Sequence, residues 1–379
     1  MSASLRITNL FLLLKVRDRL KILHVCKVFM PVKGGVQRVV SALVEAQTAD
    51  YHTILSTSDI SESESRVDEK LKVVLARSYL EIASLPIAPM LVWRYWRESK
   101  KADVIVVHYP FPLADLAIAL SLSSPPIIVY WHSDIVAQSR LKWLVAPFTY
   151  LLLLRAKSIV VTSDRVSETS WWLKKFRKKI IFIPYGTQPV RVHPLTQMPF
   201  ESFYLMVGRH VSYKGFDVGI KAMQFHNQNM VIVGRGPLLS KHVELARQLG
   251  VAERILFVTD ATDEDIAGYM ESCLGVVFPS IAKNEAFGLV QIEAMSRSKP
   301  IVNTMLPSSV PWVARNGQEA ITVSPGNVNA LALAITKLAE NPDLAEELGA
   351  NGCSRYEEMF TMDKFSVAME RLYASVVVD

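Results

Sequence analysis

Short runs of Val and Ile recur along this chain, and each is followed by a loop and a helix-length segment. Continuous β-branched runs suit strands that are buried on both faces, as in a parallel sheet covered by helices. The first such unit has a strand at 21–26, a loop that carries Gly34 and Gly35, and an apolar-periodic helix at 36–46. Strand, glycine-bearing loop and helix in this order predict a doubly wound α/β sheet.

The strand pattern forms two series. The first is expected at 21–26, 104–107, 127–130, 158–162 and 180–183, and the second at 204–207, 230–233, 255–258, 275–278, 301–304 and 320–323. Between the two series, at 184–194, the periodicity stops and three prolines occur, which is typical of a linker. The 379 residues are enough for two domains of ordinary size. We therefore predict two doubly wound, Rossmann-like α/β domains in tandem, facing a central cleft.

The breaks in this pattern also predict the domain boundaries. The expected order is a leader at 1–20, a first Rossmann-like domain at 21–185, a linker at 186–200, a second Rossmann-like domain at 201–355, and a C-terminal helix at 356–379 that returns to the first domain.

Charge, cysteine content and hydropathy argue against several classes of protein. The net charge of +6 is mild, whereas nucleic-acid binders usually show a larger and more clustered excess of Lys and Arg. Cys26, Cys273 and Cys353 are scattered, which disfavours a disulfide framework and a structural zinc site. The longest apolar run, 143–154, has 12 residues, and a membrane-spanning helix needs about 20. The apolar core at 10–14 is too short for a signal peptide, so a cytoplasmic protein is expected.

Two cations follow the first strand of the second domain. Gly208 and Arg209 come directly after the strand, and Lys214 precedes a helix that Phe216 is expected to begin. Ligands in open α/β sheets bind beyond the carboxyl ends of the strands. One planar and one point-like cation fit a diphosphate there, although two solvated surface cations are the alternative.

Glycines also follow the strand at 230–233, in the sequence Gly234-Arg235-Gly236-Pro237. The third glycine and the later acidic residue of a dinucleotide fingerprint are missing, which argues against an NAD site. A loop that closes one side of a nucleotide pocket and a plain strand-to-helix turn both stay open. For Gly34-Gly35, the alternatives are close approach of a ligand and a tight turn.

The segment at 278–295 carries two carboxylates. We expect Asn284 to cap a helix that begins at Glu285, with Glu293 eight residues later on a similar side. Ionised carboxylates accept hydrogen bonds from vicinal hydroxyl groups, which suits sugar recognition. An exposed acidic face is the alternative, and the intervening apolar residues Phe287 and Leu289 weaken it.

Taken together and in order, these segments resemble the retaining sugar-nucleotide glycosyltransferases of family 4, which have the GT-B fold. The resemblance runs from Lys21 to about Tyr356. Two further segments, 131–136 and 306–313, look like those of bacterial mannosyl- and rhamnosyltransferases of O-antigen and polysaccharide assembly.

The resemblance implies roles for matching residues. Arg209 and Lys214 would hold the donor diphosphate without a metal or other cofactor, Glu285 would bind sugar hydroxyls, and Glu293 the ribose. His132 would face the transferring sugar; a core histidine is the alternative, which the polar sequence around it disfavours. The expected donor-binding set is Gly34, Gly35, Gly208, Arg209, Lys214, Gly234, Glu285, Phe287, Gly288, Leu289 and Glu293, and the expected catalytic set is His132, Arg209, Lys214 and Glu285.

The resemblance further implies transfer of a hexose, mannose from GDP-mannose, with retention. The acceptor would be a glycan linked to undecaprenyl diphosphate, bound on the first domain, in lipopolysaccharide O-antigen or exopolysaccharide biosynthesis. A rhamnosyl- or other hexosyltransferase is the first alternative. A nucleotide-sugar epimerase on the same fold and a sugar-nucleotide binding protein without turnover are more distant ones. No nucleic-acid partner is expected.

Two segments have the composition of a lipid-interface surface. The first, 140–157, flanks leucines and aromatics with cations, and the second, 171–179, holds five cations and three aromatics. A buried leucine run and a solvated basic face are the alternatives. We expect a peripheral protein on the inner face of the cytoplasmic membrane, held in part by anionic lipid.

Overall fold

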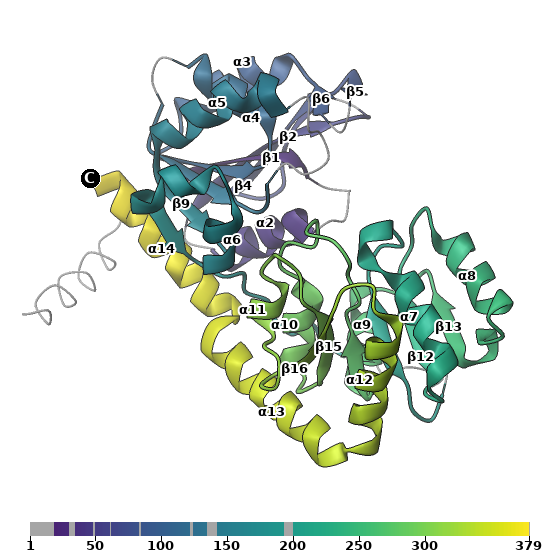
Figure 1. Ribbon diagram of the computed structural model, residues 1–379. Helices are drawn as coiled ribbons and strands as arrows, with labels where there is room; N and C mark the ends of the chain where they lie inside the picture. The colour runs from purple at the N-terminus through teal and green to yellow at the C-terminus, as the bar shows by residue number, and fades with distance from the viewer. Residues whose placement is uncertain are drawn as a thin grey trace, which may run out of the picture. The chain divides into compact units, whose positions relative to one another are not determined.

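The computed structural model describes residues 19–29, 35–47, 50–60, 62–82, 85–121, 124–134, 142–192 and 200–378. The chain divides into two compact units. The first comprises Met1–Trp131, Ala137–Ile159 and Glu370–Asp379, and the second comprises His132–Val136 and Val160–Met369. Each unit contains a largely parallel sheet with helices packed on it (Figure 1).

The first sheet has eight strands in the order β10-β9-β8-β7-β1-β2-β4-β3. Their bounds are Lys21–Val28 (β1), Tyr51–Ser58 (β2), Ser63–Arg66 (β3), Leu71–Arg77 (β4), Val104–Tyr109 (β7), Ile127–Trp131 (β8), Ala156–Val161 (β9) and Ile180–Phe182 (β10). Strands β4, β2, β1, β7 and β8 pair in parallel, and β3 is antiparallel to β4. A separate two-stranded sheet joins β5 (Leu80–Ile82) to β6 (Leu85–Ile87).

Helices cover both faces of this sheet. Helix α2 (Gly35–Ala46) lies on one face, and α3 (Met90–Ser99), α4 (Pro112–Ala119) and α5 (Lys142–Arg155) lie on the other (Figure 1). Val40 and Val44 of α2 pack against Cys26, Ile54 and Val73 of the strands. This burial of an apolar helix stripe on β-branched strand residues is what holds the layers together.

The second sheet has six parallel strands in the order β13-β12-β11-β14-β15-β16. They are Tyr204–Val207 (β11), Met230–Val233 (β12), Ile255–Val258 (β13), Gly275–Val277 (β14), Ile301–Thr304 (β15) and Ala320–Val323 (β16). The helices of this unit are Asp164–Thr169 (α6), Phe216–Ala222 (α7), Leu239–Gln248 (α8), Asp263–Ser272 (α9), Leu289–Met295 (α10), Val310–Val313 (α11), Val328–Glu340 (α12) and Pro342–Met359 (α13).

The last helix, α14 (Met362–Val378), starts in the second unit, and its residues from Glu370 belong to the first. None of the helices in the described ranges is long and apolar enough to cross a membrane. Residues 1–18 of the predicted leader and residues 193–199 of the predicted linker lie outside the described residues.

Candidate functional site

The second sheet changes direction between β11 and β14. From β11 the chain goes outward through β12 to β13, and it then returns to add β14 on the other side of β11. The loops after two such strands diverge at their carboxyl ends, where open α/β sheets bind their ligands. Arg209 and Lys214 follow β11, and Glu285 follows β14, so the sequence-predicted charged residues stand at this switch point.

The loops after β11 and β12 are joined so closely that glycines are required. The N–H of Gly208 donates to the carbonyl of Val233, and the N–H of His210 donates to the carbonyl of Arg235. A Cβ on Gly234 would lie 2.0 Å from the carbonyl oxygen of Gly208, and both residues have φ near +150°. Only glycine tolerates both conditions. The Gly-x-Gly sequence therefore has a packing role in holding the loop that carries Arg209.

The loops after β11 and β14 are also joined. Gly215 adopts a left-handed φ of 64° between Lys214 and α7, and a Cβ there would lie 2.2 Å from the carbonyl oxygen of Pro279. The N–H of Ile281 donates to the carbonyl of Tyr213 at 2.8 Å. These contacts bring Lys214 to the loop that carries Glu285.

Lys214 and Glu285 form an ion pair at the switch point. Lys214 Nζ lies 2.6 Å from Glu285 Oε2, and both side chains are largely buried. Ser280 Oγ donates to the same carboxylate oxygen at 3.2 Å, and Thr304 Oγ1 donates to the carbonyl of Ser280. The ammonium lies 5.2 Å from the centre of the Phe278 ring. An ammonium has three donors, so the pair orients Lys214 while leaving it able to bind an anion.

Arg209 is exposed on the same loop. Arg209 lies close enough to Tyr213 to affect its ionisation. Burial and the Glu285 carboxylate raise the pKa of the Tyr213 phenol, and the positive charges of Lys214 and Arg209 lower it. Arg209, Lys214 and Glu285 are therefore close enough to act electrostatically on one hydroxyl group. Tyr213 itself was not predicted from the sequence.

The expected helix start at Glu285 is wrong. Helix α10 begins at Leu289, because Gly288 adopts a left-handed φ of 84°, and residues 282–287 form turns and loop before it. A Cβ on Gly288 would lie 2.8 Å from the Phe278 ring, so this conformation is tied to close packing. Glu285 is consequently a loop residue, and Glu293 is a half-buried residue of α10. The two carboxylates do not share one helix face.

His132 is buried, contrary to the reasoning from its polar neighbours. It follows β8, is 4% exposed, and belongs to the second unit. Its Nδ1 hydrogen-bonds the hydroxyl of Tyr185, and the Tyr185 ring packs edge-on against Phe287 with 4.8 Å between centroids. Burial lowers the pKa of His132 to about 3, so the imidazole is neutral near pH 7. Tyr185 thus connects His132 with Phe287 of the predicted donor set.

Of the two predicted glycines early in the chain, the structure describes one. Gly35 begins α2 in the first unit, with open space where a Cβ would stand. Gly34 lies outside the described residues. Among the residues that the structure does describe, no three His, Cys, Asp or Glu side chains form a group that could hold a metal ion.

Ser280, Tyr213 and Tyr185 were missed in the sequence. Ser280 precedes the conspicuous Glu285 by five positions, and nothing in its spacing indicates that it donates to that carboxylate. Tyr185 lies in the proline-rich stretch that was interpreted as linker. In the segment 306–313, Ser309 stands at the N-cap position of α11 with an ordinary φ of −70°.

Family models match both halves of the chain. The model described as "Glycosyltransferase Family 4" matches residues 33–191, and "Glycosyl transferases group 1" matches residues 199–355. The O-antigen chain mannosyltransferase C of Escherichia coli is 29% identical over 371 residues, which cover 94% of this chain and 99% of the relative. The D-rhamnosyltransferase WbpZ of Pseudomonas aeruginosa is 30% identical over 355 residues, covering 90% and 92%.

Solved structures share the fold over almost the whole chain. Sucrose-phosphate synthase from Thermosynechococcus elongatus has a TM-score of 0.77 at 20% identity, covering 95% of this chain and 100% of that one. Anabaena Alr3699/HepE in complex with UDP and glucose has a TM-score of 0.76 at 18% identity, covering 94% and 100%.

Proposed function

This chain belongs to the glycosyltransferases that join a family 4 domain to a group 1 domain in the GT-B fold, and we propose that it transfers mannose from GDP-mannose. As a glycosyltransferase it is an enzyme. The proposed reaction retains the anomeric configuration and adds the sugar to a growing glycan of O-antigen or exopolysaccharide.

The observation that carries the proposal is the Lys214–Glu285 pair at the β11/β14 switch point, with Arg209 on the same loop. During transfer the nucleoside diphosphate leaves and negative charge builds on its β-phosphate. Lys214 and Arg209 would neutralise this charge from fixed positions, which stabilises a leaving group without a metal ion. Their different shapes suit two oxygens of one diphosphate.

Glu285 would accept hydrogen bonds from hydroxyl groups of the transferring sugar. Its carboxylate is held in place by Lys214 and Ser280, so it need not reorganise when the sugar binds. Glu293, on α10, would accept from the ribose hydroxyls. His132 would contact the sugar as a neutral imidazole, since burial holds its pKa near 3, and Tyr185 would set its orientation.

The named relatives support mannose or rhamnose as the transferred sugar. Two of them are described as a mannosyltransferase and a D-rhamnosyltransferase, and both align over at least 90% of this chain. GDP-rhamnose is therefore the first alternative donor. UDP-hexoses are the second, because a solved structure of the same fold holds UDP and glucose.

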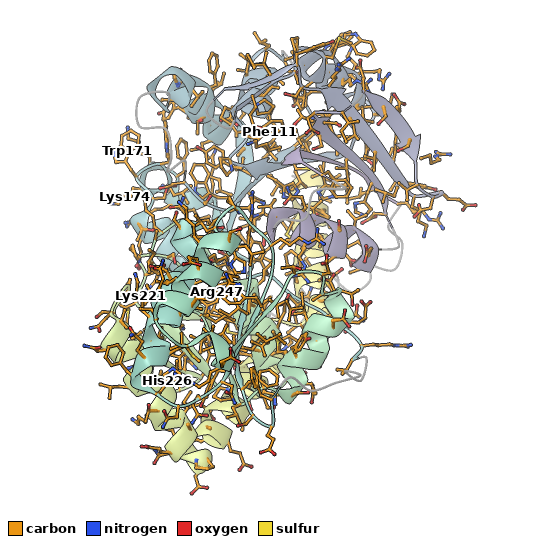
Figure 2. The ribbon with its side chains drawn as sticks, turned by 90° about the vertical axis from the view of Figure 1, so that its right-hand side faces the viewer. Phe111, Trp171, Lys174, Lys221, His226 and Arg247 are labelled. Carbon is orange, nitrogen blue, oxygen red and sulfur yellow. The ribbon has the colours of Figure 1, made fainter. Side chains whose placement is uncertain are left out.

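We further propose that the acceptor is linked to undecaprenyl diphosphate and that the enzyme works at the inner face of the cytoplasmic membrane. The predicted basic segment 171–179 supports this. Trp171 is 60% exposed, and Lys174 is exposed near it (Figure 2). In the same segment Lys175 is exposed, and Leu173 and Phe176 are buried. Buried apolar residues under exposed cations fix a basic surface that anionic lipid would attract.

Product analysis with each donor tests the proposed reaction. The purified protein is incubated with GDP-mannose, GDP-rhamnose or UDP-glucose, with and without a lipid-linked glycan. We expect glycan extension only with GDP-mannose, and an α-linked product if configuration is retained. A changed sugar in the absence of acceptor would instead identify an epimerase. Donor binding with no product in any mixture would identify a binding protein.

A further inference from the structure

Helix α3 exposes an aromatic stripe. Met90, Trp93 and Trp96 lie three residues apart and point outward, and the tryptophans are 48% and 50% exposed. Leu91 and Tyr95 of the same helix are fully buried. A spacing of three places residues on one helix face, so α3 has a buried apolar face and an exposed apolar face. The buried face packs inside the first unit, whereas the exposed face has no such partner among the described residues.

The outer face of α3 forms a groove with α4. Val92, Trp93 and Trp96 line one side, and Ala117 and Leu120 line the other, around a volume of about 350 Å³. Leu120 is 64% exposed. Helix α4 packs between α3 and α5, and α5 adds exposed Tyr150 and Leu154. Exposed apolar side chains gathered around a groove are typical of a site of interaction with a partner or a membrane.

Cations accompany the exposed indoles. The guanidinium of Arg97 lies 5.1 Å from the Trp93 ring centre, and the Lys100 ammonium lies 3.4 Å from that of Trp96. At this end of α3, Lys72, Arg97 and Lys101 form ion pairs with the two carboxylates of Glu64 and Glu98, and Lys100 adds a fourth cation over the Trp96 ring. Positive charge is therefore in excess where the aromatic stripe ends.

Carboxylates are absent from the surface of this helical layer. Within the described residues of α3, α4 and α5, the acidic residues are Glu98 and Asp115, and both are buried. Burial also raises the pKa of Asp115 to about 7, which reduces its charge. The helices themselves thus offer indoles, aliphatic groups and cations, while the exposed carboxylates of Glu62 and Glu64 beside α3 are ion-paired with Arg94 and Arg97.

We propose that the α3–α4 face docks onto an anionic lipid bilayer, with Trp93 and Trp96 in the interface and lipid chains in the groove. Indoles prefer the boundary between headgroups and hydrocarbon, and adjacent cations attract lipid phosphates. The chemistry of the groove fits hydrocarbon, because its lining is almost entirely apolar. The proposed function would explain why the protein docks onto a membrane, but lipid binding at this face does not itself require sugar transfer.

Vesicle sedimentation tests this surface. The parent and the W93S/W96S double variant are mixed with vesicles of phosphatidylglycerol and phosphatidylcholine, and with phosphatidylcholine alone. We expect the parent to bind the anionic vesicles, and the double variant to bind them at least about tenfold more weakly. An F225S variant, which changes a 60% exposed aromatic residue of the second unit outside both proposed lipid surfaces, is the matched control. It should keep most of the binding.

Equal binding of the double variant and the parent would overturn the proposal, as would failure of the parent to bind any vesicle. The second result would favour a protein partner for this face. Thermal melts of both variants check that the exposed substitutions leave the fold intact. As an independent readout, brominated lipid should quench parent tryptophan fluorescence and quench the double variant much less; equal quenching would contradict the proposal.

The same variants separate this proposal from the proposed function. Transfer of mannose to a water-soluble acceptor analogue should be unchanged in W93S/W96S, because Trp93 and Trp96 have no part in the donor site. If the parent shows no transfer but binds vesicles through these residues, the proposed function fails and the docking surface stands. If the parent transfers mannose but does not bind vesicles, the proposed function stands and the docking surface fails.

Discussion

The switch-point loops of the second unit and the sheet of the first unit both contain ionisable groups, but they hold them differently. In the second unit, Lys214 and Glu285 stand at the ends of strands and pair with each other. In the first unit, His24, His52 and His108 lie within the sheet, fully buried, and hydrogen-bond one another across β2, β1 and β7. Charged side chains at strand ends can contact a ligand, whereas polar side chains buried inside a sheet affect the stability of the fold.

His24 and His52 of this row are neutral at pH 7 in the folded protein. Burial lowers the pKa of His24 well below its usual value, and the neighbouring histidines lower it further. Burial also lowers the pKa of His52, whose Nε2 hydrogen-bonds the carbonyl of Gln47. Neutral imidazoles can donate and accept along such a row, so each partner satisfies the next. The buried polar residues of the first sheet thus satisfy one another, whereas those at the strand ends of the second sheet are the ones we propose to bind the donor.

Among the substitutions that test this comparison, we expect Glu285→Gln to lower the transfer rate most. The substitution preserves size, but it removes the charge that pairs with Lys214 and accepts from sugar hydroxyls. We expect a loss of about a thousandfold in kcat with little change in thermal stability, on the scale of losing one oriented transition-state contact. Rates from donor titrations would measure it, with Glu244→Gln on α8 as a control. A folded variant that keeps most of the parental rate would place Glu285 outside the site.

Gly234→Ala should have the next largest effect, on stability. The new Cβ would lie 2.0 Å from the Gly208 carbonyl oxygen, so the two loops must separate. We expect the free energy of unfolding to fall by about 3 kcal/mol, with loss of donor binding. Gly35→Ala is the matched control, because its Cβ would meet nothing within 4 Å. Urea unfolding of both variants decides whether the Gly-x-Gly sequence serves packing; unchanged stability of Gly234→Ala would refute that role.

Acid should destabilise the protein below pH 6.5. The folded pKa of His210 and of His226 is lowered to about 4 by burial, and that of His132 to about 3. The unfolded chain therefore binds more protons between pH 6.5 and 4, and stability present above pH 6.5 is lost as the pH falls through that range. Each such histidine contributes up to about 1.4 kcal/mol per pH unit. Asp115 acts oppositely, because its raised pKa favours the folded form at low pH.

Urea unfolding at pH 7.5, 6 and 5 measures this slope, and His226→Asn should reduce it. Asparagine keeps an acceptor for the Gln228 N–H and removes the titration. A variant with the parental slope would show that His226 is not protonated on unfolding in this range.

His132→Ala should have a smaller effect than Glu285→Gln. Its loss removes a contact to the proposed sugar and leaves the diphosphate contacts in place. We expect kcat to fall about tenfold, with the donor KM nearly unchanged, as for one lost hydrogen bond. Tyr185→Phe keeps the ring packing on Phe287 and removes the hydrogen bond to His132, so it should give part of the same loss. Normal turnover in both variants would make the pair structural.

The fold was largely predictable, since buried parallel strands are visible as Val and Ile runs. Strands β11, β12, β13, β15 and β16 have the predicted bounds. Strands β2 and β4 were missed. In β2, His52, Ser56 and Thr57 interrupt the apolar pattern, and the structure buries all three. Their burial depends on partners from other strands, such as His24, which no local pattern in the sequence indicates.

The site was predictable in its residue types and less so in its geometry. The spacing of Arg209, Lys214 and Glu285 indicated their importance, but the helix start was wrong because the left-handed conformation of Gly288 depends on contact with Phe278. The burial of His132 likewise depends on Tyr185, 53 positions away. Trp93 and Trp96 on α3 have the spacing of a core stripe, and only the tertiary structure shows that they are exposed.

The central claim is that the loop after β11 holds the donor diphosphate through Arg209 and Lys214. Calorimetric titration of GDP and GMP into the parent and the Arg209→Ala/Lys214→Ala double variant, in EDTA, tests it most directly, with Lys221→Ala as a nearby surface control (Figure 2). GMP lacks the β-phosphate that these cations would bind. Two charge-assisted contacts predict a loss of at least about a hundredfold in GDP affinity, with GMP affinity changed little. Unchanged GDP affinity in the double variant would contradict the account.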